Sequence, residues 1–136
     1  MGSTAAVAAP TRVLLADDSE LIRRTIRALL NAEPTITVVA EACDYAELLS
    51  KLCETNIDVV LMDVRMPKAA TASAEFIKAQ LRDSCLLAIS FANDEETLLL
   101  AKSYGAFRLL DKTELAHTLV PAIKECAQAP TKGVIA

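Results

Sequence analysis

Short apolar runs alternate along the chain with longer stretches in which apolar residues recur every three or four positions. The short runs have the length of β-strands, and the longer stretches have the period of amphipathic helices. The run at 59–62 is apolar throughout, as expected of a central parallel strand covered on both faces. The pattern therefore predicts repeated strand–helix–strand units, with strands at 11–16, 36–40, 59–62, 86–90 and 107–110.

Capping residues mark where the first helices begin and end. The first helix carries an apolar stripe between Leu21 and Leu30 and is expected to stop before Pro34. Asp44, with Glu47 three residues later, predicts a capping box that opens the second helix. A third helix is expected around residues 74–81.

Similar signals bound the last two helices. Asn93 and Glu96 predict a capping pair for the fourth helix, and Gly105 is expected to end it in a left-handed conformation. Thr113 is the expected N-cap of the fifth helix. Pro121 lies inside that helix, so a kink or a break is expected there.

Right-handed crossovers between such units give an open, doubly wound parallel α/β sheet of five strands with five helices. A chain of 136 residues is long enough for one such domain, and we see no internal repeat or second core. We expect the domain at residues 11–127, a disordered segment at 1–10 and a linker-like tail at 128–136. Functional residues are expected at the carboxyl ends of the strands.

The composition is that of an ordinary soluble protein. Hydrophobic residues make up 53% of the chain and charged residues 24%, with a net charge of −4, so nothing indicates nucleic-acid binding. No apolar window has the length of a membrane span, and no signal peptide is apparent. The four cysteines form no C-x-x-C pair and lie in apolar stretches, which favours free thiols in a reducing cytoplasm.

Polar residues follow the predicted strands at the edge where a site is expected. They are Asp17, Asp18, Asp63, Ser90 and Lys112. Three neighbouring carboxylates repel one another unless a cation joins them, and hard oxygen ligands suit Mg²⁺. A lysine and a hydroxyl beside that metal supply the contacts that phosphoryl transfer to a carboxylate needs.

Each of these residues also has a simpler explanation. Asp17 and Asp18 alone are typical of a helix-capping pair, Asp63 of an Asx-turn, and Lys112 of a solvated loop. Their joint spacing, rather than any one of them, favours an acidic pocket.

This set of residues resembles the receiver domain of two-component response regulators, over about residues 11–127. The resemblance implies a flavodoxin-like fold with strand order 2-1-3-4-5, and it makes Asp63, in Leu-Met-Asp-Val-Arg-Met-Pro, the phosphoacceptor. It also implies that Mg²⁺ is bound by Asp18, Asp63 and the backbone carbonyl of Arg65, with Asp17 acting mostly through water. Ser90 then corresponds to the hydroxyl that contacts the phosphoryl group, and also serves as a switch residue. Lys112 corresponds to the lysine that pairs with that group.

The wording Leu-Leu-Ala-Asp-Asp-Ser, Val-Val-Ala-Glu-Ala and Leu-Leu-Asp-Lys-Thr looks most like receivers of the NarL/FixJ type. Such receivers usually carry a C-terminal helix-turn-helix domain, which is absent from this chain, and DNA would be reached only through it. The implied partner is a sensor histidine kinase that meets the first helix, with Arg23, Arg24 and Arg27 as candidate contacts. A solvated basic face is the alternative. A homodimer is left open.

Four positions depart from the family pattern. Leu109 stands where receivers usually have an aromatic switch residue, and it offers neither a ring nor a hydroxyl. Phe91 follows Ser90 where a small residue is usual, and its ring is expected to narrow access to Asp63. The loop at 68–71 lacks the usual glycine, and Thr113 replaces a frequent proline.

These departures leave two functions to compare with phosphoacceptance. A degenerate receiver would act as a phosphorylation-independent interaction module. A hydrolase of the aspartyl-phosphate class would need a second acid where Arg65 stands, so it fits poorly. Nucleotide and flavin binding fit poorly too, because the first turn has Asp-Asp in place of a glycine-rich cradle. The leading interpretation is a domain that catalyses only its own modification and is otherwise no enzyme.

Overall fold

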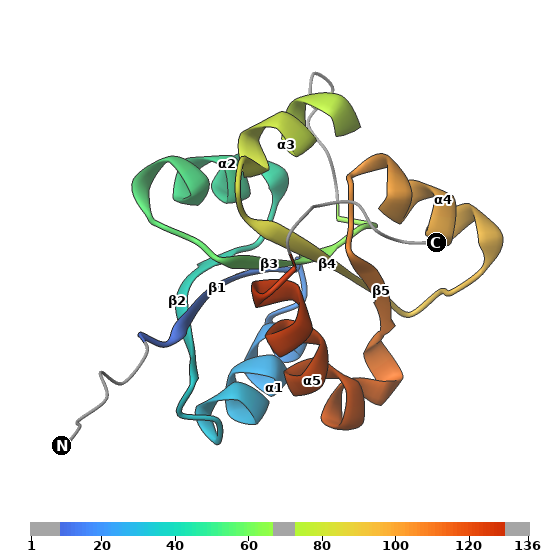
Figure 1. Cartoon of the computed structure of the whole chain (residues 1–136). Helices are drawn as coiled ribbons and strands as arrows, with labels where there is room; N and C mark the ends of the chain where they lie inside the picture. The colour runs from blue at the N-terminus through green and yellow to red at the C-terminus, as the bar shows by residue number, and fades with distance from the viewer. Residues whose placement is uncertain (1–8, 67–72, 130–136) are drawn as a thin grey trace, which may run out of the picture.

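The computed structural model describes residues 9–66 and 73–129 (Figure 1). The loop at 68–71 lies outside the described residues, as does most of the expected N-terminal segment and C-terminal tail. Strands and helices alternate along the chain as the apolar pattern predicts. The elements are β1 (Thr11–Ala16), α1 (Glu20–Asn31), β2 (Ile36–Ala42), α2 (Tyr45–Glu54), β3 (Val59–Asp63), α3 (Ala74–Leu81), β4 (Cys85–Ser90), α4 (Glu95–Ser103), β5 (Arg108–Asp111), the 3-10 turn η1 (Lys112–Glu114) and α5 (Leu115–Ala127).

The five strands form one parallel sheet in the order β2-β1-β3-β4-β5, which confirms the predicted topology. Helices α1 and α5 cover one face, and α2, α3 and α4 lie on the other (Figure 1). Every residue of β3 and β4 is buried, as the continuously apolar run at 59–62 predicts for a central strand. None of the described helices is long and apolar enough to cross a membrane.

Each face of the sheet has its own hydrophobic core. Ile26 and Leu30 of α1 pack with Leu119 and Ile123 of α5 beneath one face. On the other face, α2, α3 and α4 contribute a second cluster that contains Tyr45 and Tyr104. Their hydroxyls form a buried hydrogen bond of 3.1 Å, and burial raises the pKa of Tyr45 far above its ordinary value. This neutral pair joins α2 to the end of α4.

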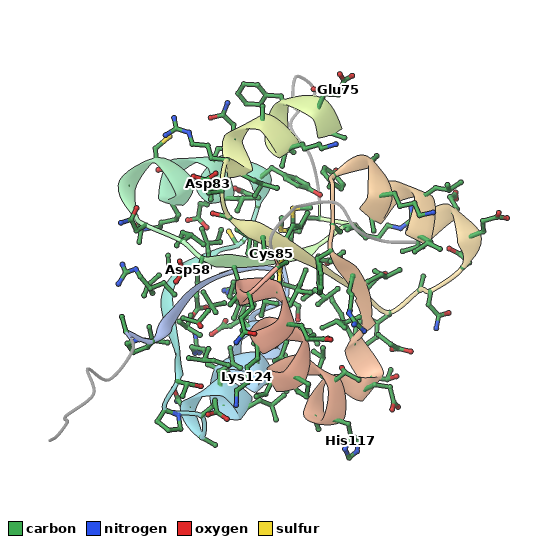
Figure 2. All side chains as sticks on the ribbon, in the orientation of Figure 1. Asp58, Glu75, Asp83, Cys85, His117 and Lys124 are labelled. Atoms are coloured by element: carbon green, nitrogen blue, oxygen red, sulfur yellow. A yellow bond between two sulfur atoms is a disulfide. The ribbon has the colours of Figure 1, made fainter. Side chains whose placement is uncertain are left out.

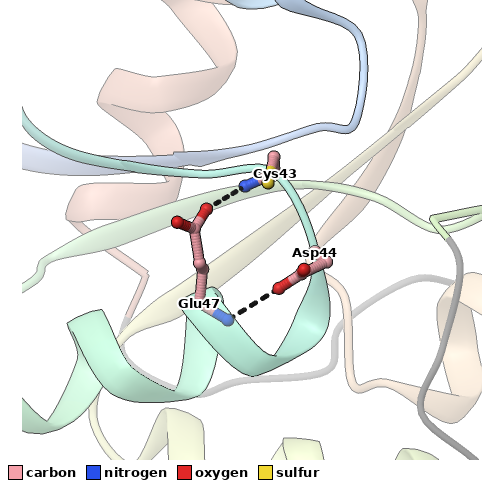
Figure 3. Close-up of side chains that lie close together, drawn as sticks. All are labelled: Cys43, Asp44 and Glu47. Atoms are coloured by element: carbon pink, nitrogen blue, oxygen red, sulfur yellow. Dashed lines mark hydrogen bonds between the residues drawn. The ribbon is translucent and has the colours of Figure 1, made fainter.

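The predicted capping box of α2 is confirmed. The N–H of Glu47 donates to Asp44 Oδ1 at 2.8 Å, and Glu47 Oε1 accepts from the backbone N–H of Cys43 (Figure 3). The glutamate therefore reaches back to the residue before the cap. Both side chains thus accept hydrogen bonds from backbone N–H groups that have no acceptor within the helix.

Two predicted caps are wrong by one or two residues. Helix α4 is capped by Asp94, whose Oδ1 accepts from the N–H of Thr97, and not by Asn93 with Glu96. Asp111 accepts from Thr113 N and Oγ1 to open η1, and α5 follows without a side-chain cap. In both cases several polar residues were adjacent, and only the backbone path decides which of them precedes the first turn.

Gly105 and Pro121 behave differently from one another. Gly105 has φ +78 and its N–H donates to the Lys102 carbonyl at 2.9 Å, so it ends α4 as predicted. A Cβ at Gly105 would also approach the Lys78 side chain to 3.0 Å. Helix α5 runs from Leu115 to Ala127 across Pro121 without a break, so a split at Pro121 is wrong and the alternative, a kink, stays a prediction.

The expectation of four free cysteines is also wrong. Cys85 at the start of β4 and Cys126 in the last turn of α5 form a disulfide, and their Cα atoms are 5.8 Å apart (Figure 2). The two residues are 41 positions apart in sequence and meet only because α5 packs on β4. Cys43 and Cys53 are free and exposed. The thiol argument for a reducing compartment therefore no longer applies.

Breaking the disulfide should destabilise the domain without changing its topology. A bridge spanning 41 residues restricts the unfolded chain, so Cys126→Ser should lower the free energy of unfolding by about 2–4 kcal/mol. The measurement is chemical unfolding of the parent and the variant, each with and without dithiothreitol. Cys53→Ser is the matched control, since that thiol is free. Equal stability of the oxidised parent and Cys126→Ser would contradict the prediction.

Candidate functional site

Three carboxylates meet at the carboxyl edge of the sheet. Asp17 directly follows β1, and Asp63 is the last residue of β3. These strands pair in parallel with Ala16 opposite Met62, so the next residue of each arrives at the same place. One carboxylate oxygen from each of Asp17, Asp18 and Asp63 lies within 4.8 Å of the others. The predicted convergence of the three acids is therefore present.

The two buried acids are oriented by the loops that follow them. Asp17 Oδ1 accepts from the N–H of Ser19 at 2.8 Å, and Asp63 Oδ1 accepts from the N–H of Arg65 at 2.8 Å. Asp17 and Asp63 are buried, whereas Asp18 is exposed. Each buried carboxylate thus uses one oxygen to fix its loop and directs the other toward the site.

Lys112 lies between those remaining oxygens. Its Nζ is 2.6 Å from Asp17 Oδ2 and 3.1 Å from Asp63 Oδ2, and its side chain is only 4% exposed. Lys112 begins η1 immediately after β5, the edge strand, which β4 separates from β3. The ring of Phe91 lies beside it, with its centroid 5.1 Å from Nζ. Because that ring is 63% exposed, it borders the site on the solvent side, as the steric expectation for Phe91 requires.

Burial disfavours the charged form of Asp17. Desolvation raises the pKa of Asp17, although Lys112 and the Ser19 N–H oppose the shift. Lys112 Nζ lies 2.6 Å from Asp17 Oδ2, and among the described residues this buried oxygen has no further polar partner. Three acids against one lysine leave excess negative charge. This donor set fits a divalent cation that prefers oxygen ligands.

The remaining predicted residues lie at the same edge or beside it. Ser90 ends β4 and is buried, and its Oγ accepts from the N–H of Ala92 at 3.0 Å. Asp63 pairs with Ile89, the neighbour of Ser90, across β3 and β4. Leu109 in β5 is half-buried and packs against the α2, α3 and α4 cluster. None of the described hydrogen bonds joins Ser90 to Asp63.

Sequence reasoning missed a contact from this site to α4. Arg65 Nη2 donates to the Thr97 hydroxyl at 2.9 Å, and Thr97 is fully buried. Hydrogen bonds from Thr97 lower the pKa of Asp94, the N-cap of the same helix, and the Arg65 charge acts in the same direction. Arg65 and Thr97 are 32 residues apart with no motif to connect them. Only the folded arrangement identifies the pair.

A second group of potential ligands is the α2 capping box. Cys43, Asp44 and Glu47 also bring ligand atoms within 4.8 Å of one another (Figure 3). Their hydrogen bonds to backbone N–H groups explain that proximity.

The chain belongs to the response-regulator receiver-domain family, because the model of that family matches residues 13–124. This confirms the resemblance drawn from the acidic residues and the lysine.

Curated relatives include whole regulators of more than one kind. The uncharacterized transcriptional regulatory protein YxjL of Bacillus subtilis is 33% identical over 118 residues, covering 86% of this chain and 54% of the relative. The transcriptional regulatory protein LiaR of the same organism is 32% identical over 122 residues, covering 89% and 58%. A protein-glutamate methylesterase/protein-glutamine glutaminase of Pyrococcus abyssi is 29% identical over 132 residues, covering 89% and 36%. The chain thus spans about half or less of the relatives' length.

Solved structures agree on the fold. The receiver domain of the putative response regulator NarL from Mycobacterium tuberculosis has a TM-score of 0.79 at 28% identity, covering 90% of this chain and 99% of that one. The response regulator domain of Thermotoga maritima CheB has a TM-score of 0.77 at 23% identity with the same coverage. The likeness to NarL-type receivers is therefore found in both sequence and structure.

Neutralising Asp17 should stabilise the metal-free domain. Because the pKa of Asp17 is raised on folding, its charge opposes folding at neutral pH, and this effect disappears as the pH falls below the raised pKa. Asp17→Asn should therefore increase the free energy of unfolding at pH 7 by on the order of 1 kcal/mol. The gain should vanish in acid. Denaturant unfolding with a chelator at several pH values measures both, and Asp44→Asn, at a half-buried carboxylate, is the comparison. A loss of stability at pH 7 would contradict it.

Proposed function

We propose that this domain accepts a phosphoryl group on Asp63 from the phosphohistidine of a sensor kinase. The observation that carries the proposal is the position of Asp63, whose Oδ2 lies 3.1 Å from Lys112 Nζ at the carboxyl edge of the sheet, beside two further acids. Receiver-family membership supports the same reaction.

In the proposed reaction a carboxylate oxygen of Asp63 attacks phosphorus. A P–O bond forms as the P–N bond to the donor histidine breaks, and the leaving imidazole takes a proton from solvent. Negative charge spreads over the phosphoryl oxygens, and Lys112 is placed to pair with it. The buried hydroxyl of Ser90 would donate to the same group after leaving the Ala92 N–H.

The acids would hold Mg²⁺ during this step. Asp18, Asp63 and the Arg65 carbonyl would be direct ligands, and Asp17 would act through water. The close approach of the three carboxylates and their excess over the one lysine support this assignment. When bound, the ion would neutralise charge on the carboxylates and on the transferred group.

A kinase would dock on α1 in this proposal, though not through all three arginines. Arg23 and Arg27 both pair with Glu41 of β2, and Arg23 also donates to the Asp17 carbonyl. Arg24 is mostly exposed and makes only a long contact with Glu20. Arg24 and the exposed Leu21 are therefore the preferred contacts.

The output of the proposed signal is not set by this domain. Its relatives include transcriptional regulators and methylesterases, so the same receiver family serves different effectors. We propose that the domain modifies only itself and that DNA would be reached only through a separate output domain. A homodimer stays a prediction.

Intact mass spectrometry tests the proposal directly. Incubation with Mg²⁺ and acetyl phosphate should add one phosphoryl group to the parent and none to Asp63→Asn. Asp58→Asn is the matched control, because Asp58 lies just before the opposite end of β3 and holds the N–H of Arg12. Asp18→Ala should require far more Mg²⁺. An unmodified parent would instead favour a phosphorylation-independent interaction module.

Phe91 should slow both formation and loss of the phosphoryl group. Its exposed ring borders Lys112 and narrows the approach to Asp63. Phe91→Ala should increase the rates of phosphorylation and of phosphoryl loss about two- to fivefold. We take this size from the free energy of a partly exposed cation–π contact such as the one between Phe91 and Lys112. Time-resolved intact mass gives the rates, and Phe76→Ala, which removes an exposed ring from α3, is the control. Unchanged rates would show that the ring does not restrict the site.

A further inference from the structure

One arginine contacts both the candidate acceptor loop and α4. We propose that Arg65 couples the state of Asp63 to α4: it holds the helix through Thr97 while Asp63 is unmodified, and releases it to bind the phosphoryl group. The inference rests on the proposed function, since it requires a phosphoryl group on Asp63.

The two ends of Arg65 have separate partners. Its backbone N–H donates to Asp63 Oδ1 at 2.8 Å, and its Nη2 donates to Thr97 Oγ1 at 2.9 Å. A single residue, Arg65, thus links the acceptor carboxylate to α4. Any displacement of the Asp63 carboxylate or its loop acts directly on the residue that binds the helix.

The guanidinium has a stronger partner available after phosphorylation. Its present partner is a neutral hydroxyl, and a charge-assisted bond to a phosphoryl oxygen is roughly twice as strong as a neutral one. Arginine also has a planar fork of donors that matches phosphate geometry. Asp94 is the nearby competing charge, but it already accepts from the N–H of Thr97. The phosphoryl group should therefore draw Arg65 away from α4.

The start of α4 has little else to hold it. Residues 91–96 are all exposed, and Thr97 is the first buried residue of the helix. Loss of Arg65 would leave the buried Thr97 hydroxyl without its donor. Leu109, which packs behind this region, has no polar group to compensate. The first turn of α4 should consequently open more often.

Amide hydrogen exchange of residues 94–103 tests the coupling, with intact mass recording the phosphoryl group in each sample. In the unmodified state, Arg65→Ala and Thr97→Val should each exchange about two- to tenfold faster than the parent in α4. Phosphorylation should accelerate α4 exchange in the parent and add little in either variant. Arg65→Ala keeps the backbone carbonyl that we propose as a Mg²⁺ ligand, and Thr97→Val keeps every group around Asp63.

Conservative variants separate this coupling from general loosening. Thr97→Ser keeps the hydroxyl and should behave like the parent. Thr118→Val is the control, because the Thr118 hydroxyl donates to the Glu114 carbonyl one turn earlier and makes no described contact with α4. If Thr97→Val responds to phosphorylation as strongly as the parent, or if both variants have parental α4 exchange before modification, the coupling is overturned and the proposed function stands. If the parent acquires no phosphoryl group, the proposed function fails and the coupling with it.

Discussion

The buried ion network of Asp17, Lys112 and Asp63 is the interaction on which the site depends. Lys112 reaches 2.6 Å from one carboxylate and 3.1 Å from the other, and so joins the ends of β1, β3 and β5. Removing Lys112 from this network would leave two buried carboxylates without their shared counter-charge. Burial raises the pKa of Asp17 although Lys112 opposes the shift, so the one lysine does not fully offset the desolvation of this carboxylate. The fold therefore maintains an electrostatic imbalance at the edge of the sheet.

The fold followed from the sequence because each level of organisation agreed with the next. Short apolar runs and helical periodicity predicted the elements, and the handedness of crossovers then limited the topology. The acids and Lys112 were identified because strand ends in a parallel sheet lie at one edge, whatever the loops do. Boundary errors were small, and they arose where several capping residues compete, as at Asn93 and Asp94.

What could not be predicted depends on side chains that meet across the fold. The Cys85–Cys126 bridge joins positions 41 residues apart, and the bond from Arg65 to Thr97 spans 32. Neither pair has a characteristic spacing, because each contact depends on the packing of a helix against the sheet. The pairing of Arg23 and Arg27 with Glu41 is similar, and it gives two of the three proposed kinase contacts a partner within the domain. Local pattern identified the groups but not their partners.

Because of the disulfide, the helices on the two faces of the sheet are held with different firmness. The last turn of α5 is tied covalently to β4, so that end of the helix can separate from the sheet only if the S–S bond breaks. On the opposite face, Arg65 holds the start of α4 and Tyr45 holds its end, each through a hydrogen bond that can exchange partners on thermal timescales. A structural change at the acidic edge can therefore displace α4 more easily than the last turn of α5. A partner resting on α4 could sense that change, whereas one bound only to α5 would contact a surface that behaves as an extension of the sheet.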